Sequence, residues 1–198
     1  MTDRPRFAVH SRTGDTGAPG PPPGAGRRAR SLLAFAAVAQ DPNPALELTT
    51  IRGVTRSLDD WSTTFNLAIV LLPGRPEAAA FLPVVDRLYA TFGDSDVRAT
   101  ICVAADEAIA RRILGDVADR YLVLCDPGSE LAGSLGLERL PAFVHLRQDT
   151  TVVSAAEGFD AAEWQKVADG IARLKHWSSP KVAGRGCPPA TRGWPLSA

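Results

Sequence analysis

The stretch that decides the fold reads LAIVLLPGRPEAAAFLPVVDRLYATFG and spans residues 67–93. Its first six residues are all apolar, which predicts a strand buried on both faces of a sheet. Its second half carries apolar residues at helical spacing. Pro76 suits the first helical position and Gly93 suits the stop. Pro83 lies inside this helix, so we expect a kink there.

Strands and helices alternate on both sides of this stretch. Ser57 and Asp60 form a helix-capping pair, as do Asp160 and Glu163. Two late apolar runs separated by a polar turn predict a hairpin. Strands are expected near residues 46–54, 97–104, 121–124, 142–146 and 151–155, with further helices after Asp106 and Ser129. This order predicts an α/β fold with a central mixed sheet, mostly parallel with a closing antiparallel hairpin, flanked by helices.

Composition limits the functional classes. The chain has 198 residues, 45% of them apolar, and its formal net charge is zero. That balance offers no electrostatic footprint for nucleic acid. No apolar run approaches the about 18 residues that a membrane span needs. We therefore expect no nucleic-acid partner and no membrane span.

The two ends differ from the middle. Residues 1–30 and 176–198 are rich in Gly, Pro and polar residues, a composition typical of disorder. We expect residues 1–45 to be disordered or weakly structured, residues 46–175 to form one domain, and residues 176–198 to be a disordered tail. Within the first part, residues 27–39 join three arginines to a short apolar run ending in Ala-Val-Ala, which resembles a signal peptide. A cytoplasmic location is expected, with export as the alternative.

Three cysteines, Cys102, Cys125 and Cys187, are too far apart for a CxxC motif or a zinc site. Cys102 falls inside a strand, where a small buried hydrophobic residue is expected. Cys125 falls at a strand end before a turn. His145 lies in an apolar run and is interpreted as a half-buried structural residue. We expect no metal and no cofactor.

The order of elements resembles the thioredoxin superfamily. A proline in that family's active-site helix lies five residues after the second cysteine of CxxC, and Pro83 matches it. Counting back places the CxxC positions on Arg75, Pro76, Glu77 and Ala78, so neither cysteine is present. A second match is Leu140-Pro141 before an apolar strand, where the family carries a cis-proline facing the active site.

A third match narrows the resemblance to the redoxin branch, meaning peroxiredoxins and TlpA-like proteins. These insert a helix and a strand that end in a motif similar to Leu124-Cys125-Asp126-Pro127-Gly128. The resemblance covers residues 46–175. It implies a thioredoxin-like domain that lacks the thiols of its branch.

Two functions follow from the resemblance. The first is a non-catalytic protein-interaction or chaperone-like module, in which a groove formed by residues 75–78 with Leu140 and Pro141 binds an extended peptide through the backbone. The second is a thiol-dependent oxidoreductase or peroxidase that uses Cys125 as a single atypical cysteine. The missing thiols favour the first.

Overall fold

The computed structural model describes residues 39–92 and 95–196, which belong to one compact unit. Residues 1–38 and 93–94 lie outside the described residues. The first range holds most of the expected N-terminal extension and nearly all of the signal-like stretch, and the second holds Gly93. Within the described residues, no helix has both the length and the apolar character needed to cross a bilayer.

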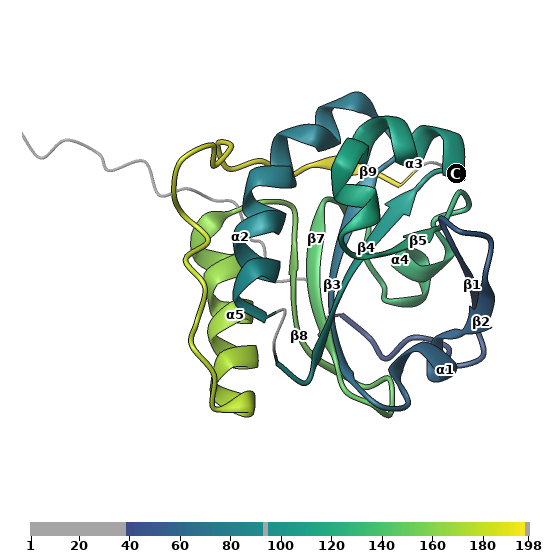
Figure 1. Ribbon diagram of the computed structural model, residues 1–198, viewed down its shortest axis with the longest axis horizontal. Helices are drawn as coiled ribbons and strands as arrows, with labels where there is room; N and C mark the ends of the chain where they lie inside the picture. The colour runs from purple at the N-terminus through teal and green to yellow at the C-terminus, as the bar shows by residue number, and fades with distance from the viewer. Residues whose placement is uncertain (1–38, 93–94, 197–198) are drawn as a thin grey trace, which may run out of the picture. The chain divides into compact units, whose positions relative to one another are not determined.

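The centre of the unit is a seven-stranded mixed sheet in the order β2-β1-β5-β4-β3-β7-β8 (Figure 1). The strands are β1 (Glu47–Thr50), β2 (Thr55–Ser57), β3 (Asn66–Pro73), β4 (Val97–Ala104), β5 (Leu122–Cys125), β7 (Ala142–Leu146) and β8 (Val152–Glu157). The expected mixed sheet is confirmed. Its parallel part is limited to the pairs of β4 with β3 and β5, and the other pairs are antiparallel. The expected single strand near residues 46–54 is instead a hairpin, β1–β2.

Helices cover both faces of the sheet. They are α1 (Leu58–Ser62), α2 (Leu82–Phe92), α3 (Glu107–Leu114), α4 (Glu130–Ser134) and α5 (Ala161–Lys175), with 3₁₀ helices η1 (Pro76–Phe81) and η2 (Gly115–Asp119). One apolar cluster joins α2, α3 and α5 to one face, and a second joins α1 and α4 to the other. Figure 1 shows α2 and α5 side by side and α4 across the sheet from them. Strands β3, β4 and β7 are therefore buried between two layers.

The expected kinked helix is two helices. Residues 76–81 form η1, and α2 begins at Leu82. Pro83 is thus in the first turn of α2, where its missing N–H needs no partner. The caps of α1 and α5 are as expected, with Ser57 accepting from the Asp60 amide and Asp160 from the Glu163 amide.

The cap of α4 differs from the expectation. Ser129 has φ 55° and its side chain accepts no cap hydrogen bond. The carboxylate of Asp126 accepts instead from the amides of Glu130 at 2.8 Å and Leu131 at 2.9 Å. A carboxylate four residues before the first helical residue satisfies the amides that the helix N-terminus leaves unpaired.

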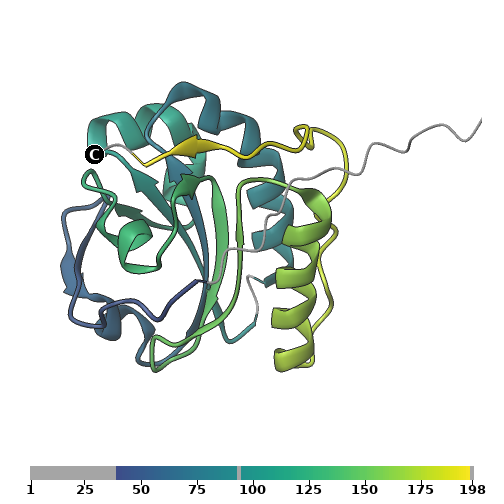
Figure 2. The ribbon, with the colours of Figure 1, turned by 180° about the vertical axis from the view of Figure 1, so that it is seen from behind.

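The C-terminal segment is ordered over residues 176–196, contrary to the expected disordered tail. Val182 is fully buried, and β9 (Trp194–Pro195) pairs with β6 (Arg139–Leu140). Seen from behind in Figure 2, the yellow segment follows α5 and then crosses one end of the sheet. A few specific contacts hold it: Arg87 donates to the carbonyls of Lys181, Val182 and Arg185. Composition alone does not reveal such contacts, because they depend on side chains elsewhere in the chain.

The start of the domain also lies earlier than expected. The Gln40 amide donates to the Leu135 carbonyl at 3.0 Å, and Asp41 accepts from the Val152 amide at 2.7 Å. Residues 40–45 are therefore attached to the domain that was expected to begin at residue 46.

Candidate functional site

Two loops predicted to form a groove meet at one end of the central strands β3 and β7. Residues 75–78 follow β3, and Leu140-Pro141 precedes β7. Strands β3 and β7 are antiparallel neighbours, with Leu71 opposite Ala142, so the end of one adjoins the start of the other. The Leu140–Pro141 peptide bond is cis. The structure therefore brings the two predicted segments together.

A small cavity of about 230 Å³ lies between these loops. Its lining comes from both loops, from the ends of β4 and α4, and from β9: Pro73, Gly74, Arg75, Ala104, Ser129, Leu140, Trp194, Pro195 and Leu196. Among the predicted residues, Arg75 and Leu140 line it. Pro76 and Glu77 are exposed beside it, and Ala78 and Pro141 are buried. The groove was expected, whereas the C-terminal segment that lies along it and lines the remaining cavity was not.

The C-terminal segment occupies the groove as an extended strand. In the antiparallel β6–β9 pair, Leu140 lies opposite Trp194. The Leu196 amide donates to the Glu138 carbonyl at 3.0 Å. Arg139 donates to the carbonyls of Arg192 at 3.2 Å and Gly193 at 2.9 Å. Most of these contacts involve the main chain of the segment, so they position it independently of its sequence.

Trp194 is the side chain that the groove holds. The Arg75 guanidinium carbon lies 4.9 Å from the centre of its ring. Phe81 meets the ring edge-on, with the ring centres 6.4 Å apart. Sequence reasoning missed Trp194, and the only local signal was a tryptophan in an otherwise Gly- and Pro-rich segment.

The helix start that carries thiols in the family carries an ion pair here. Arg75 Nε lies 3.1 Å from a Glu77 carboxylate oxygen. The backbone amide of Glu77, and then Arg75, lower the pKa of this carboxyl. Both side chains are largely exposed, so the pair adds little to stability. Since Ala78 fills the other predicted thiol position, the site offers a cation and a groove, and neither CxxC position carries a thiol.

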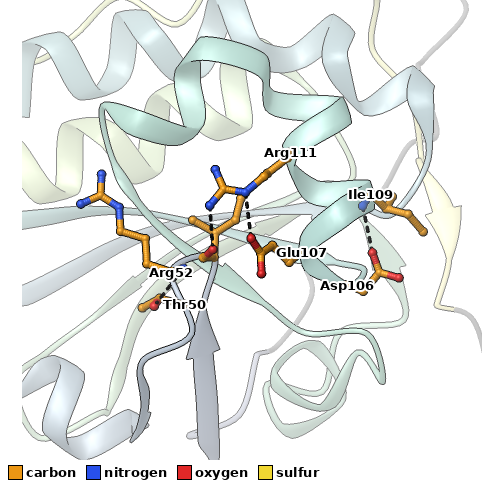
Figure 3. Close-up of polar contacts among 7 residues, drawn as sticks. Thr50, Arg52, Asp106, Glu107, Ile109 and Arg111 are labelled. Atoms are coloured by element: carbon orange, nitrogen blue, oxygen red, sulfur yellow. Dashed lines mark hydrogen bonds and ion pairs between the residues drawn. The ribbon is translucent and has the colours of Figure 1, made fainter.

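Cys125, the alternative nucleophile, ends β5. With β4 between β5 and β3, it is two strand spacings, roughly 10 Å, from β3. It is partly exposed, and burial and then the carboxylates of Glu107 and Asp106 raise the pKa of its thiol. Figure 3 shows these acids at the start of α3, with Asp106 as its N-cap residue and with Arg111 bound to Glu107 at 2.9 Å and to the Ile51 carbonyl at 3.0 Å. A raised thiol pKa leaves little thiolate, the reactive form, at neutral pH.

The other cysteines are further from a redox role. Cys102 is buried in β4, and burial raises the pKa of its thiol well above the ordinary value. Cys187 lies in the C-terminal segment and packs against the α2 side of the core. All three are free thiols.

A larger cleft of about 550 Å³ opens at the other end of the parallel strands, near the starts of β4 and β5. Three of its arginines each lie over an aromatic ring: Arg56 over Trp61, Arg98 over Phe65 and Arg120 over Tyr121. Arg120 also pairs with Asp86 at 2.9 Å. These intramolecular contacts give the arginines a structural role.

The architecture now identifies the fold: a parallel β5-β4-β3 core, an antiparallel β7–β8 hairpin, and a cis-proline opposite the start of η1. The fold is thioredoxin-like. The comparison with solved structures agrees. A putative thiol:disulfide interchange protein DsbE from Chlorobium tepidum superposes with a TM-score of 0.57 at 16% identity, over 70% of this chain and 98% of that one.

Two further thioredoxin-like structures are similar to this chain. Peroxiredoxin Q from Xanthomonas campestris has a TM-score of 0.56 at 14% identity, over 71% of this chain and 96% of the other. The thioredoxin domain of a Bacteroides vulgatus thiol-disulfide oxidoreductase has a TM-score of 0.55 at 13% identity, over 69% and 99%. No protein-family profile and no curated protein matches the chain. The expected likeness to redoxins is thus confirmed at the level of the fold.

Proposed function

We propose that this thioredoxin-like protein is a non-catalytic module that binds an extended polypeptide strand in the groove between Arg75 and Leu140. The observation that carries the proposal is the β6–β9 pair, in which the groove already holds an extended strand. Main-chain pairing at a sheet edge is a general way to bind peptides, with side-chain pockets adding selectivity. It requires no thiol, in keeping with Arg75 and Ala78 at the CxxC positions.

The test uses a displayed library of random ten-residue peptides, panned against the full chain. Selected peptides are expected to lose affinity by about tenfold or more with Leu140→Asp or Arg75→Glu, since tenfold is about 1.4 kcal/mol. The matched control is Leu174→Asp, because Leu174 is exposed on α5. A variant with all three cysteines changed to Ser is expected to bind as the wild type does.

Two results would contradict the proposal. One is a set of selected peptides whose affinity neither groove substitution changes. The other is loss of binding in the cysteine-free variant, which would assign the function to a thiol. Circular dichroism on every variant separates these results from unfolding.

The second candidate is a thiol-dependent oxidoreductase or peroxidase acting through Cys125. The partial exposure of Cys125 at the end of β5 supports it, while its raised pKa opposes it. This function predicts dithiothreitol-dependent peroxide consumption or disulfide reduction that Cys125→Ser abolishes. Absence of both activities in the wild type would remove it.

A further inference from the structure

We infer that the groove selects strands in which a glycine is followed by an aromatic residue, and that residues 191–196 of this chain compete with such a partner for the same place. The inference rests on the proposed function and names its partner class and its regulation. The sequence of the bound segment is Thr-Arg-Gly-Trp-Pro-Leu. Two of its positions restrict the residue type: one has no room for a side chain, and the other holds an aromatic ring.

Gly193 meets the first requirement of the groove. Its φ is +74°, and a Cβ atom placed there would collide with the Leu140 carbonyl oxygen and lie 3.1 Å from Pro141 Cδ. The carbonyl and the proline ring belong to the cis-proline loop, so they are fixed parts of the groove. A strand in this register therefore needs glycine opposite that loop.

Trp194 meets the second requirement. Its ring lies between the Arg75 guanidinium and the edge of Phe81. Cation–π and edge-to-face contacts are both properties of aromatic rings. An aliphatic residue could fill the space but would gain neither contact, so the groove favours an aromatic residue directly after the glycine.

The bound segment can be displaced from the groove by another strand. Strand β9 has two residues, and most of residues 183–190 are exposed. The segment is anchored before them, where the Gln165 side chain bonds the Val182 amide at 2.9 Å and the Pro180 carbonyl at 2.8 Å. Residues 191–196 leave the groove by breaking the β6–β9 pair and the two Phe159–Thr191 backbone hydrogen bonds of 2.8 Å, while this anchor keeps them nearby. Such a tether gives a local concentration on the order of millimolar, which an outside strand must overcome.

The experiment measures binding of a fluorescein-labelled peptide with the sequence of residues 189–196 to the full chain. Gly193→Ala in the chain should expel residues 191–196 and leave the groove intact. The apparent Kd is expected to fall by about tenfold or more relative to the wild type, because an occupied site weakens apparent affinity by the fraction of molecules that are open. The control is Gly133→Ala, whose Cβ would meet nothing within 4 Å.

Selectivity is tested on the peptide with Gly193→Ala as the receptor. Changing the peptide's glycine to alanine, or its tryptophan to leucine, is expected to weaken binding at least about tenfold, and changing tryptophan to phenylalanine much less. If circular dichroism shows that Gly193→Ala does not fold, Trp194→Ala in the chain replaces it as the receptor. That substitution loosens the segment and keeps Arg75 and Phe81.

Each alternative result would overturn one part of the inference. Equal affinity of the wild type and the opened variant overturns the competition and leaves strand binding in place. Equal affinity for the glycine and alanine peptides overturns the selectivity. No binding to either receptor overturns the proposed function as well. A wild-type dimer that Gly193→Ala dissociates would assign the segment to the groove of a second copy and overturn competition within one chain.

Discussion

At the scale of the residue, His145 combines burial with unbonded polar atoms. It lies in β7, its side chain is fully buried, and neither ring nitrogen has a hydrogen-bond partner among the described residues. Ser154, directly opposite on β8, has a buried hydroxyl that also lacks one. Burial, and then the charges of Lys175 and Arg147, lower the pKa of His145 to about 4. The folded protein therefore holds a neutral imidazole.

The lowered pKa of His145 predicts that the protein loses stability in mild acid. The pKa of His145 is lower in the folded state than the 6.5 of the unfolded chain, so below pH 6.5 the unfolded state binds a proton that the folded state excludes. Between pH 7 and pH 5 the contribution to the free energy of unfolding falls by about 2 kcal/mol. Urea unfolding at both pH values measures it.

The matched variants separate His145 from other titrating groups. His145→Leu is expected to remove most of the pH dependence, whereas His176→Asn, at the exposed end of α5, should keep it. An unchanged difference between pH 7 and pH 5 in His145→Leu would refute the assignment.

Tyr89 carries a second prediction at this scale. Its buried hydroxyl accepts from the Val70 amide at 3.0 Å and contacts the Thr100 and Ala68 carbonyls, so it links α2 to β3 and β4. Tyr89→Phe leaves a buried amide without this partner and should cost about 1–3 kcal/mol. Chemical denaturation provides the measurement, with Tyr121→Phe as the control because water can reach that partly exposed ring. Equal losses in the two variants would contradict the role of the buried hydroxyl.

At the scale of the element, two residues could cap the N-terminus of α4, namely Asp126 and Ser129. Asp126 bonds two of its amides, and Ser129 bonds none through its side chain. Asp126→Ala should therefore lower the free energy of unfolding by about 1–2 kcal/mol, Asp126→Asn should restore much of it, and Ser129→Ala should change it little. Equilibrium unfolding of the three variants measures these changes. A larger loss of stability for Ser129→Ala than for Asp126→Ala would assign the cap to Ser129.

The elements show what the sequence can and cannot predict. The uninterrupted run of six apolar residues was sufficient to predict β3, since a strand buried on both faces leaves such a pattern. Strand β4 was predicted although Arg98 and Thr100 interrupt its apolar residues. The family resemblance predicted that the loops containing Arg75 and Leu140 form the groove. The cap by Asp126 was missed because Ser129 has the more common position for a cap. The place of Trp194 had no local signature, because the contacts that hold it come from Arg75, Phe81 and β6, far away in the chain.

At the scale of the whole molecule, the C-terminal segment lies along the groove and occupies it. Its position depends on Arg87 in α2, whose guanidinium donates to the Lys181, Val182 and Arg185 carbonyls at 3.3, 2.7 and 2.7 Å. One planar group with several donors can satisfy three carbonyls, whereas a lysine ammonium at the same place has no matching geometry. The Arg87 contacts thus hold the segment at a point separate from the Gln165 contacts and from the groove.

This arrangement predicts the effect of loosening the anchor alone. Arg87→Ala should raise the rate of limited trypsin cleavage after Lys181 and Arg185 by about tenfold, since local opening controls proteolysis and tenfold is about 1.4 kcal/mol. The cleavage rate of Arg87→Lys should lie between those of Arg87→Ala and the wild type. Arg112→Ala, which removes an exposed arginine from α3, is the control. Mass spectrometry of the fragments over time provides the measurement. If Arg87→Ala is cut at the rate of the control, the Arg87 contacts contribute nothing to keeping the segment closed, and the Gln165 and groove contacts hold it.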